Sequence, residues 1–132
     1  SFSSSQSLCF FCIDMDGDGW LDVVKRELGG PTLVHWARCG EASWMRVSLR
    51  QPGDNPNAIG ARVRVLAPNA EIAGVVRAGG TSYASSGPPE VHLGLGDAPR
   101  VERLQVIWPD GAVTMLHDLD VDQHLIVTRE RR

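Results

Sequence analysis

The sequence contains no apolar run of eighteen or more residues and no lysine-led apolar leader. Because a membrane-spanning helix needs about 20 consecutive apolar residues, we expect no membrane span, and no secretion signal is visible within the chain. A signal that has been removed, or that lies upstream of a fragment, agrees with the same observation. An excess of basic charge is also absent. The 13 Lys and Arg stand against 16 Asp and Glu, and the net charge of −3 excludes a basic field for a nucleic-acid backbone.

Cysteine is scarce and odd in number, since Cys9, Cys12 and Cys39 leave at most one disulfide and one free thiol. The C-x-x-C spacing of Cys9 and Cys12 suits a redox pair where it opens a helix whose dipole lowers the thiol pKa. Here it lies in an apolar stretch typical of a strand. No second C-x-x-C or His pair completes four zinc ligands. We therefore expect buried thiols, or one bridge from Cys39 to Cys9 or Cys12.

A sustained helical period is missing as well, because no stretch of a dozen residues repeats its apolar positions every three to four. From Trp44 onward, short strands alternate with turns, which is typical of an all-β sandwich. We expect this sandwich to span 44–128, with a linker at 37–43. Residues 1–36 carry a β-hairpin and a short third apolar stretch, Thr32–Trp36. They are too few to close a core, so their strands should lean on the sandwich or on another chain.

Within the expected sandwich, several stretches alternate apolar and polar side chains, which is the period of a half-buried strand. The apolar positions are Met45, Val47 and Leu49; Ala61, Val63 and Val65; and Val91, Leu93 and Leu95. Glu71–Ala78 is expected to be a further strand. Pro109, Asp110 and Gly111 should form a tight hairpin turn, because Pro followed by Gly suits that geometry.

One acidic run stands out near the N-terminus. It places four carboxylates within nine residues, at Asp14, Asp16, Asp18 and Asp22. Ca²⁺ takes six to eight oxygens, and alternating carboxylates with intervening glycines let a tight loop direct several of them to one point. We predict that these side chains and the backbone carbonyl of Trp20 bind one Ca²⁺. An EF-hand is excluded, because loop position twelve is Lys25 rather than Glu. The alternative is a solvated acidic turn, which repulsion between the carboxylates disfavours.

No catalytic arrangement is visible among the other polar residues. The four histidines, His35, His92, His117 and His124, lack the spacing of a zinc site. Ser82, Ser85 and Ser86 lie outside any G-x-S-x-G elbow. A second acidic cluster, Asp118, Asp120 and Asp122, has no glycine for a tight wrap, so a polar turn is favoured there. We expect a non-catalytic protein, and a hydrolase is the least favoured alternative.

Aromatic residues are few, with four Trp, three Phe and one Tyr, and most are expected in cores. For a carbohydrate-binding β-sandwich, the second alternative, one would want exposed aromatic rings as stacking platforms. Trp36 and Tyr83 are the candidates for that role.

Three segments of the second half carry a family resemblance. Asn55–Val63, Gly94–Gly96 and Trp108–Gly111 together resemble the ASPIC/UnbV domain. The D-x-D-G-D-G-x-x-D core of Phe11–Val24 is similar to the calcium loop of one FG-GAP (VCBS) repeat. The order of repeat and terminal domain is that of the cartilage acidic protein-like family. The resemblance covers most of the chain, from about Cys9 to Val127.

This resemblance implies a transthyretin-like or Ig-like β-sandwich preceded by a β-hairpin from a propeller-type calcium repeat. It also implies a secreted, extracellular protein that works in adhesion or protein association, without established enzymatic activity. A propeller needs several blades and only the end of one is present, so the chain is expected to be a fragment or to meet other subunits. Contact residues would then be Phe10, Phe11, Leu33 and Trp36.

The family motifs also have physical interpretations as structural elements. Ile59 is expected to fill part of the core, and Gly60 to let the backbone pass close to a neighbour. Gly94 and Gly96 should form a bend or bulge. Trp108 before Pro109 should anchor the core at a strand end.

Overall fold

The computed structural model describes residues 7–27, 29–37, 40–79 and 87–130. These residues form ten β-strands and no helix, so the predicted all-β class is confirmed. They divide into two compact units: the first holds the described residues up to 37 with Gly79 and 87–88, and the second holds 40–78 and 89–130. In the described ranges, no helix is long and apolar enough to cross a membrane.

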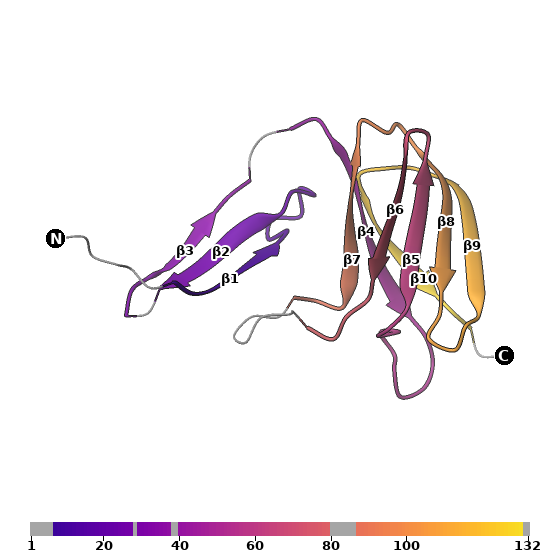
Figure 1. Cartoon of the computed structure of the whole chain (residues 1–132), viewed down its shortest axis with the longest axis horizontal. Helices are drawn as coiled ribbons and strands as arrows, with labels where there is room; N and C mark the ends of the chain where they lie inside the picture. The colour runs from indigo at the N-terminus through magenta and orange to yellow at the C-terminus, as the bar shows by residue number, and fades with distance from the viewer. Residues whose placement is uncertain (1–6, 28, 38–39, 80–86, 131–132) are drawn as a thin grey trace. The chain divides into compact units, whose positions relative to one another are not determined.

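The first unit is a three-stranded antiparallel sheet in the order β1-β2-β3 (Figure 1). Its strands are β1 (Ser7–Ile13), β2 (Asp22–Glu27) and β3 (Thr32–His35). The predicted hairpin gains a third strand, because the third apolar stretch pairs with β2 and places His35 opposite Val23. Val24 is the one buried apolar side chain among the described residues of this unit. The sheet thus has almost no core of its own.

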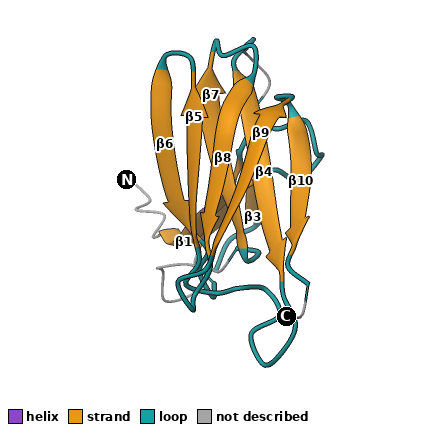
Figure 2. Ribbon diagram, turned by 90° about the vertical axis from the view of Figure 1, so that its right-hand side faces the viewer, coloured by secondary structure: helices purple, strands orange, loops and turns teal. Residues whose placement is uncertain are grey.

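The second unit is a β-sandwich of two sheets, in the orders β10-β4-β7 and β6-β5-β8-β9 (Figure 2). The strands of the first sheet are β4 (Ser43–Arg50), β7 (Glu90–Gly96) and β10 (Gln123–Thr128). Those of the second are β5 (Arg62–Ala67), β6 (Ala70–Val75), β8 (Val101–Ile107) and β9 (Val113–Leu119). All pairings are antiparallel except β10 with β4, which is parallel. Strand β10 therefore forms one edge of its sheet, beside β4.

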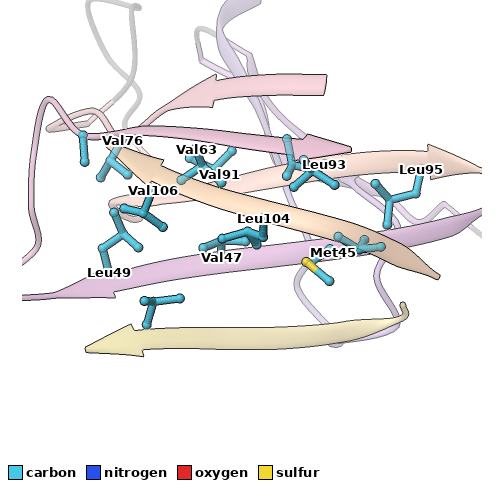
Figure 3. Packing of buried hydrophobic residues seen from close by; sticks show 14 of the residues in the cluster. Met45, Val47, Leu49, Val63, Val76, Val91, Leu93, Leu95, Leu104 and Val106 are labelled. Carbon is cyan, nitrogen blue, oxygen red and sulfur yellow. The ribbon is translucent and has the colours of Figure 1, made fainter. Parts of the chain in front are cut away.

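The core lies between these two sheets, and the alternation read in the sequence decides which side chains enter it. Figure 3 shows the labelled apolar side chains directed toward one another between the two layers. The fully buried members include Met45, Val47, Leu49, Val63, Val65, Leu104 and Val106. Burial of one such side chain stabilises the fold by about 1.5–3 kcal/mol. The three alternating stretches predicted from the sequence are confirmed as β4, β5 and β7.

The family motifs take mostly the structural roles expected. Trp108 is buried, and its Nε1 donates to Thr114 Oγ1 at 2.8 Å. The pairing register between β4 and β7 shifts where Gly94 and Gly96 face Trp44 and Ser43, so a bulge is confirmed. Ile59 packs partly buried against the core.

Two expectations are corrected. The backbone of Gly60 does approach a neighbouring segment, since its N donates to Val76 O at 2.8 Å, but this approach does not require glycine, because an added Cβ would meet no heavy atom within 4 Å. Glycine is required there by its φ of +92°, which side-chain-bearing residues rarely adopt. The strand expected to reach Ala78 ends at Val75.

Candidate functional site

The acidic loop connects β1 to β2 in the first unit. Ile13, the last residue of β1, pairs with Asp22, the first residue of β2, so the intervening residues form a closed excursion. Gly17 and Gly19 have φ values of +79° and +91°. These left-handed conformations fit glycine and turn the chain twice within the loop.

Three of the four predicted carboxylates converge in this loop. Asp14, Asp16 and Asp18 each offer one oxygen, and these oxygens lie within 4.8 Å of one another. Asp14 is 8% exposed, whereas Asp16 and Asp18 are exposed. Carboxylates that converge in this way repel one another unless a cation lies between them. The three potential ligand atoms are all oxygens, as a hard divalent cation requires.

Backbone amides hold these carboxylates in position. Asp14 Oδ1 accepts from Gly17 N at 2.8 Å, and Asp14 Oδ2 accepts from Gly19 N at 3.0 Å. Asp16 Oδ1 accepts from Asp18 N at 3.3 Å, and Asp18 Oδ1 accepts from Trp20 N at 2.8 Å. The last two are Asx turns, in which a side chain bonds its own backbone two residues on. The loop is therefore built by the same side chains that would bind the ion.

Asp22 lies outside the converging group. It is 0% exposed, and its Oδ2 accepts from Met15 N at 3.1 Å while its Oδ1 accepts from Ala37 N at 2.9 Å. Its carboxylate thus joins the start of the loop to the segment after β3. Ligation of Ca²⁺ by Asp22 and by the Trp20 carbonyl stays a prediction. Asp22 would bind the ion directly or through a water molecule.

The second acidic cluster spans the end of β9, with Asp118, and the turn that leads to β10, with Asp120 and Asp122. Asp118 and Asp122 have φ values of +54° and +56°. Asp122 Oδ1 accepts from Trp44 N at 3.0 Å, and Asp122 N donates to Trp44 O at 2.7 Å. These bonds tie the start of β10 to β4, which agrees with the expected polar turn.

Other predicted positions are placed as follows. Trp36 is 45% exposed. Cys12 is an exposed free thiol, so the alternatives of burial or of a bridge from Cys39 are wrong for Cys12. Tyr83, Cys39 and the serines at 82, 85 and 86 lie outside the described residues, as does the side chain of Cys9.

The sandwich also carries a polar cluster whose members lie far apart in the sequence, so that no motif spacing predicts it. Ser48 lies on β4, and the two neighbours of this strand in the sheet, β10 and β7, carry His124 and Glu90. Ser48 Oγ is 2.7 Å from His124 Nε2 and donates to Glu90 Oε2 at 3.3 Å. Arg46 Nη2 is 3.3 Å from His124 Nδ1. Pairing of β4 with two strands distant in sequence brings these groups together.

The direction of these hydrogen bonds decides what the cluster can do. A guanidinium only donates, so the contact with Arg46 assigns the acceptor role to His124 Nδ1 and, in the neutral ring, the proton to Nε2. Nε2 then donates to Ser48 Oγ, whose own proton goes to Glu90. A serine nucleophile needs a histidine that accepts its proton. With this assignment the order is reversed, and the contacts link three strands of the sheet.

A family model confirms what the sandwich motifs suggest. The model described as ASPIC and UnbV matches residues 51–132, more than half of the chain. The chain belongs to the ASPIC and UnbV family. No curated protein matches it.

The ASPIC and UnbV match begins immediately after β4, which ends at Arg50. Yet β4 is the middle strand between β10 and β7, and it contributes Met45, Val47 and Leu49 to the core. The folded ASPIC and UnbV sandwich therefore needs residues upstream of the matched segment. The similarity of Phe11–Val24 to an FG-GAP repeat stays a prediction.

Proposed function

We propose that this protein is an extracellular, non-catalytic β-module that binds Ca²⁺ in the loop between β1 and β2 and mediates protein association. The observation that carries the calcium part is the convergence of Asp14, Asp16 and Asp18 to within 4.8 Å. Three carboxylates on a loop this tight match the charge and the oxygen preference of Ca²⁺. Mg²⁺ fits less well, because it demands a strict octahedron and dehydrates reluctantly.

An extracellular location is part of the same proposal. Calcium sites of extracellular modules work at about 10⁻⁴–10⁻³ M, and two of the three converging carboxylates are exposed. A site of that kind stays loaded outside cells. It would serve as a structural clamp rather than as a calcium sensor.

The association part rests on the first unit. Its described residues bury one apolar side chain, Val24, while large apolar side chains remain exposed. The exposed ones are Phe10 (66%), Met15 (50%), Leu21 (41%), Leu33 (38%) and Trp36 (45%). A three-stranded sheet with so little core needs a covering surface. Strands β1 and β3 are the outer strands of this sheet as the described residues form it, and an outer strand can pair with a further strand, as in a propeller blade.

Calorimetry tests the calcium part. Wild type should bind one Ca²⁺, and Asp16→Ala should lose most of the heat, because a converging carboxylate is removed. Asp120→Ala is the matched control, since it removes an equally exposed carboxylate from the turn between β9 and β10. Equal heats for wild type and Asp16→Ala, or none for either, would contradict the proposal.

Light scattering tests the association part. Wild type should form oligomers at micromolar concentration, and Phe10→Ser should shift the distribution to monomer because Phe10 is the most exposed large apolar side chain among the residues that the structure describes. Val113→Ser on β9, which replaces another side chain that is 53% exposed, is the control. A monomeric wild type that captures no partner through its first unit would remove the support for association.

A further inference from the structure

A cavity of about 370 Å³ lies on the sandwich, among residues that nothing above assigns to a function. Its walls come from the segment after β4, the turn between β8 and β9, and the segment after β10. They include Gln51, Pro52, Pro109, Asp110, Arg129 and Glu130. Small-molecule sites have volumes of about 300–1,000 Å³, so the cavity has room for one small ring.

The wall of the cavity contains a bidentate ion pair. Arg129 donates from Nη1 to Asp110 Oδ1 and from Nη2 to Asp110 Oδ2, each at 2.8 Å. The guanidinium also lies 5.6 Å from the centre of the Trp108 ring. Arg129 N donates to Arg50 O at 2.8 Å, and Asp110 Oδ1 accepts from Ala112 N at 3.1 Å. Both charged groups are therefore oriented before any ligand arrives.

The ion pair stays charged over the ordinary pH range. The hydrogen bonds from Arg129 lower the pKa of Asp110 from 3.8 to about 2, and the same contact raises the pKa of Arg129. The paired carboxylate and guanidinium present acceptors and donors side by side. Arg129 has five N–H groups, and the pair with Asp110 uses two of them.

The charges lining the cavity favour a neutral ligand over a charged one. An anion would face the carboxylates of Asp110 and Glu130. A cation would face Arg129 and a carboxylate already paired with it. A neutral polyhydroxyl ring meets neither penalty, because each hydroxyl both donates and accepts. Vicinal hydroxyls can bond the Asp110–Arg129 pair, and the rings of Pro52 and Pro109 offer an apolar surface to the C–H face of a sugar.

We propose that this cavity is a binding site for the neutral pyranose ring of a saccharide, held by Asp110, Arg129 and Glu130. Gln51 supplies an amide at the rim; its Nε2 donates to Asn55 O at 2.8 Å. The inference goes beyond the proposed calcium and association role. It uses residues of the sandwich alone, so it does not depend on the loop between β1 and β2.

Amide chemical shifts of the full chain, followed during a titration, test this site. The probes are the methyl glycosides of glucose, galactose and mannose, each up to about 50 mM, because single-ring sugars bind in the millimolar range. Glucosamine and glucuronate are charged analogues of similar shape. At least one neutral glycoside should move the amides of Gln51, Asp110 and Arg129 with saturation, and both charged analogues should bind at least about threefold more weakly.

Substitutions of lining residues test whether the sugar binds in this cavity. Glu130→Ala removes an exposed carboxylate with no hydrogen bond in the described chain, so the fold is retained, and it should weaken binding about fivefold or more. Asp110→Asn should weaken it further. Asp120→Ala, in the turn at the other end of β9, should change nothing. The inference is overturned if no glycoside moves the lining amides, if Glu130→Ala and Asp110→Asn bind like wild type, or if a calcium chelator abolishes binding.

Discussion

Replacement of Asp22 by asparagine separates two roles of that carboxylate, holding the loop and binding the ion. Asp22 is 0% exposed and accepts one backbone N–H on each oxygen, from Met15 and from Ala37. Asp22→Asn preserves the shape but replaces one acceptor by an NH₂ donor. That donor then faces a backbone N–H, so one amide loses its partner.

The size of the effect follows from these two bonds. A hydrogen bond to a charged acceptor contributes about 1.5–3 kcal/mol, and a buried N–H left without a partner costs about 1–3 kcal/mol. We expect Asp22→Asn to destabilise the calcium-free first unit by about 3 kcal/mol. This corresponds to a roughly hundredfold larger opening constant.

Hydrogen exchange is the suitable assay, because local opening of a small unit is visible there without global unfolding. In chelator, the amides of Met15 and Ala37 should exchange roughly a hundredfold faster in Asp22→Asn than in wild type. Asp16→Asn is the matched control: it removes a charge from the loop, yet it should leave these two amides protected. Unchanged exchange in Asp22→Asn, together with a loss of calcium binding, would refute the holding role and make Asp22 a ligand only.

Three further outcomes are expected. Ca²⁺ at about 100 times its Kd should stabilise the first unit by about 2.7 kcal/mol, so Tm should rise and return with chelator; a Tm indifferent to both counts against the site. Gly74→Ala should cost about 1–3 kcal/mol in urea unfolding, because its Cβ would collide with Val91 Cγ1, whereas Gly94→Ala meets open space and is the control. Arg129→Ala should return the pKa of Asp110 from about 2 toward 3.8, followed by carboxyl ¹³C titration; a value still near 2 would assign the shift to another group. In wild type this pair should stabilise the fold fully above about pH 4 and lose that effect as the pH falls toward 2.

Local patterns of the sequence were enough to predict the strands and their buried faces. Met45, Val47 and Leu49 are spaced by two residues and all are fully buried, because a strand turns alternate side chains to the same face. The turn at Pro109–Gly111 closes with a bond from Gly111 N to Trp108 O at 2.9 Å. The three converging aspartates were likewise predictable, since all three lie within one segment of five residues, 14–18.

Strand pairing was beyond the reach of those patterns. The parallel alignment of β10 with β4 joins residues 78 positions apart, such as His124 and Arg46. The same alignment creates the Ser48–His124 contact, whose reversed hydrogen-bond direction no spacing rule contains. The Asp110–Arg129 pair spans 19 residues across two different segments. Each of these features depends on which strands become neighbours, and apolar alternation is equally compatible with several sheet orders.

The hydrogen bonds of the loop also bear on how it would take up an ion. Asp16 and Asp18 each use one oxygen, Oδ1, for a backbone N–H, and the second oxygen of each makes no hydrogen bond within the described chain. The side chains are therefore oriented by the backbone while an oxygen of each remains available for a cation. Ordering a loop on binding lowers affinity by the entropy that is lost. Because hydrogen bonds from its own Asx turns and from Asp22 hold this loop, calcium should bind with little structural change outside the carboxylates themselves.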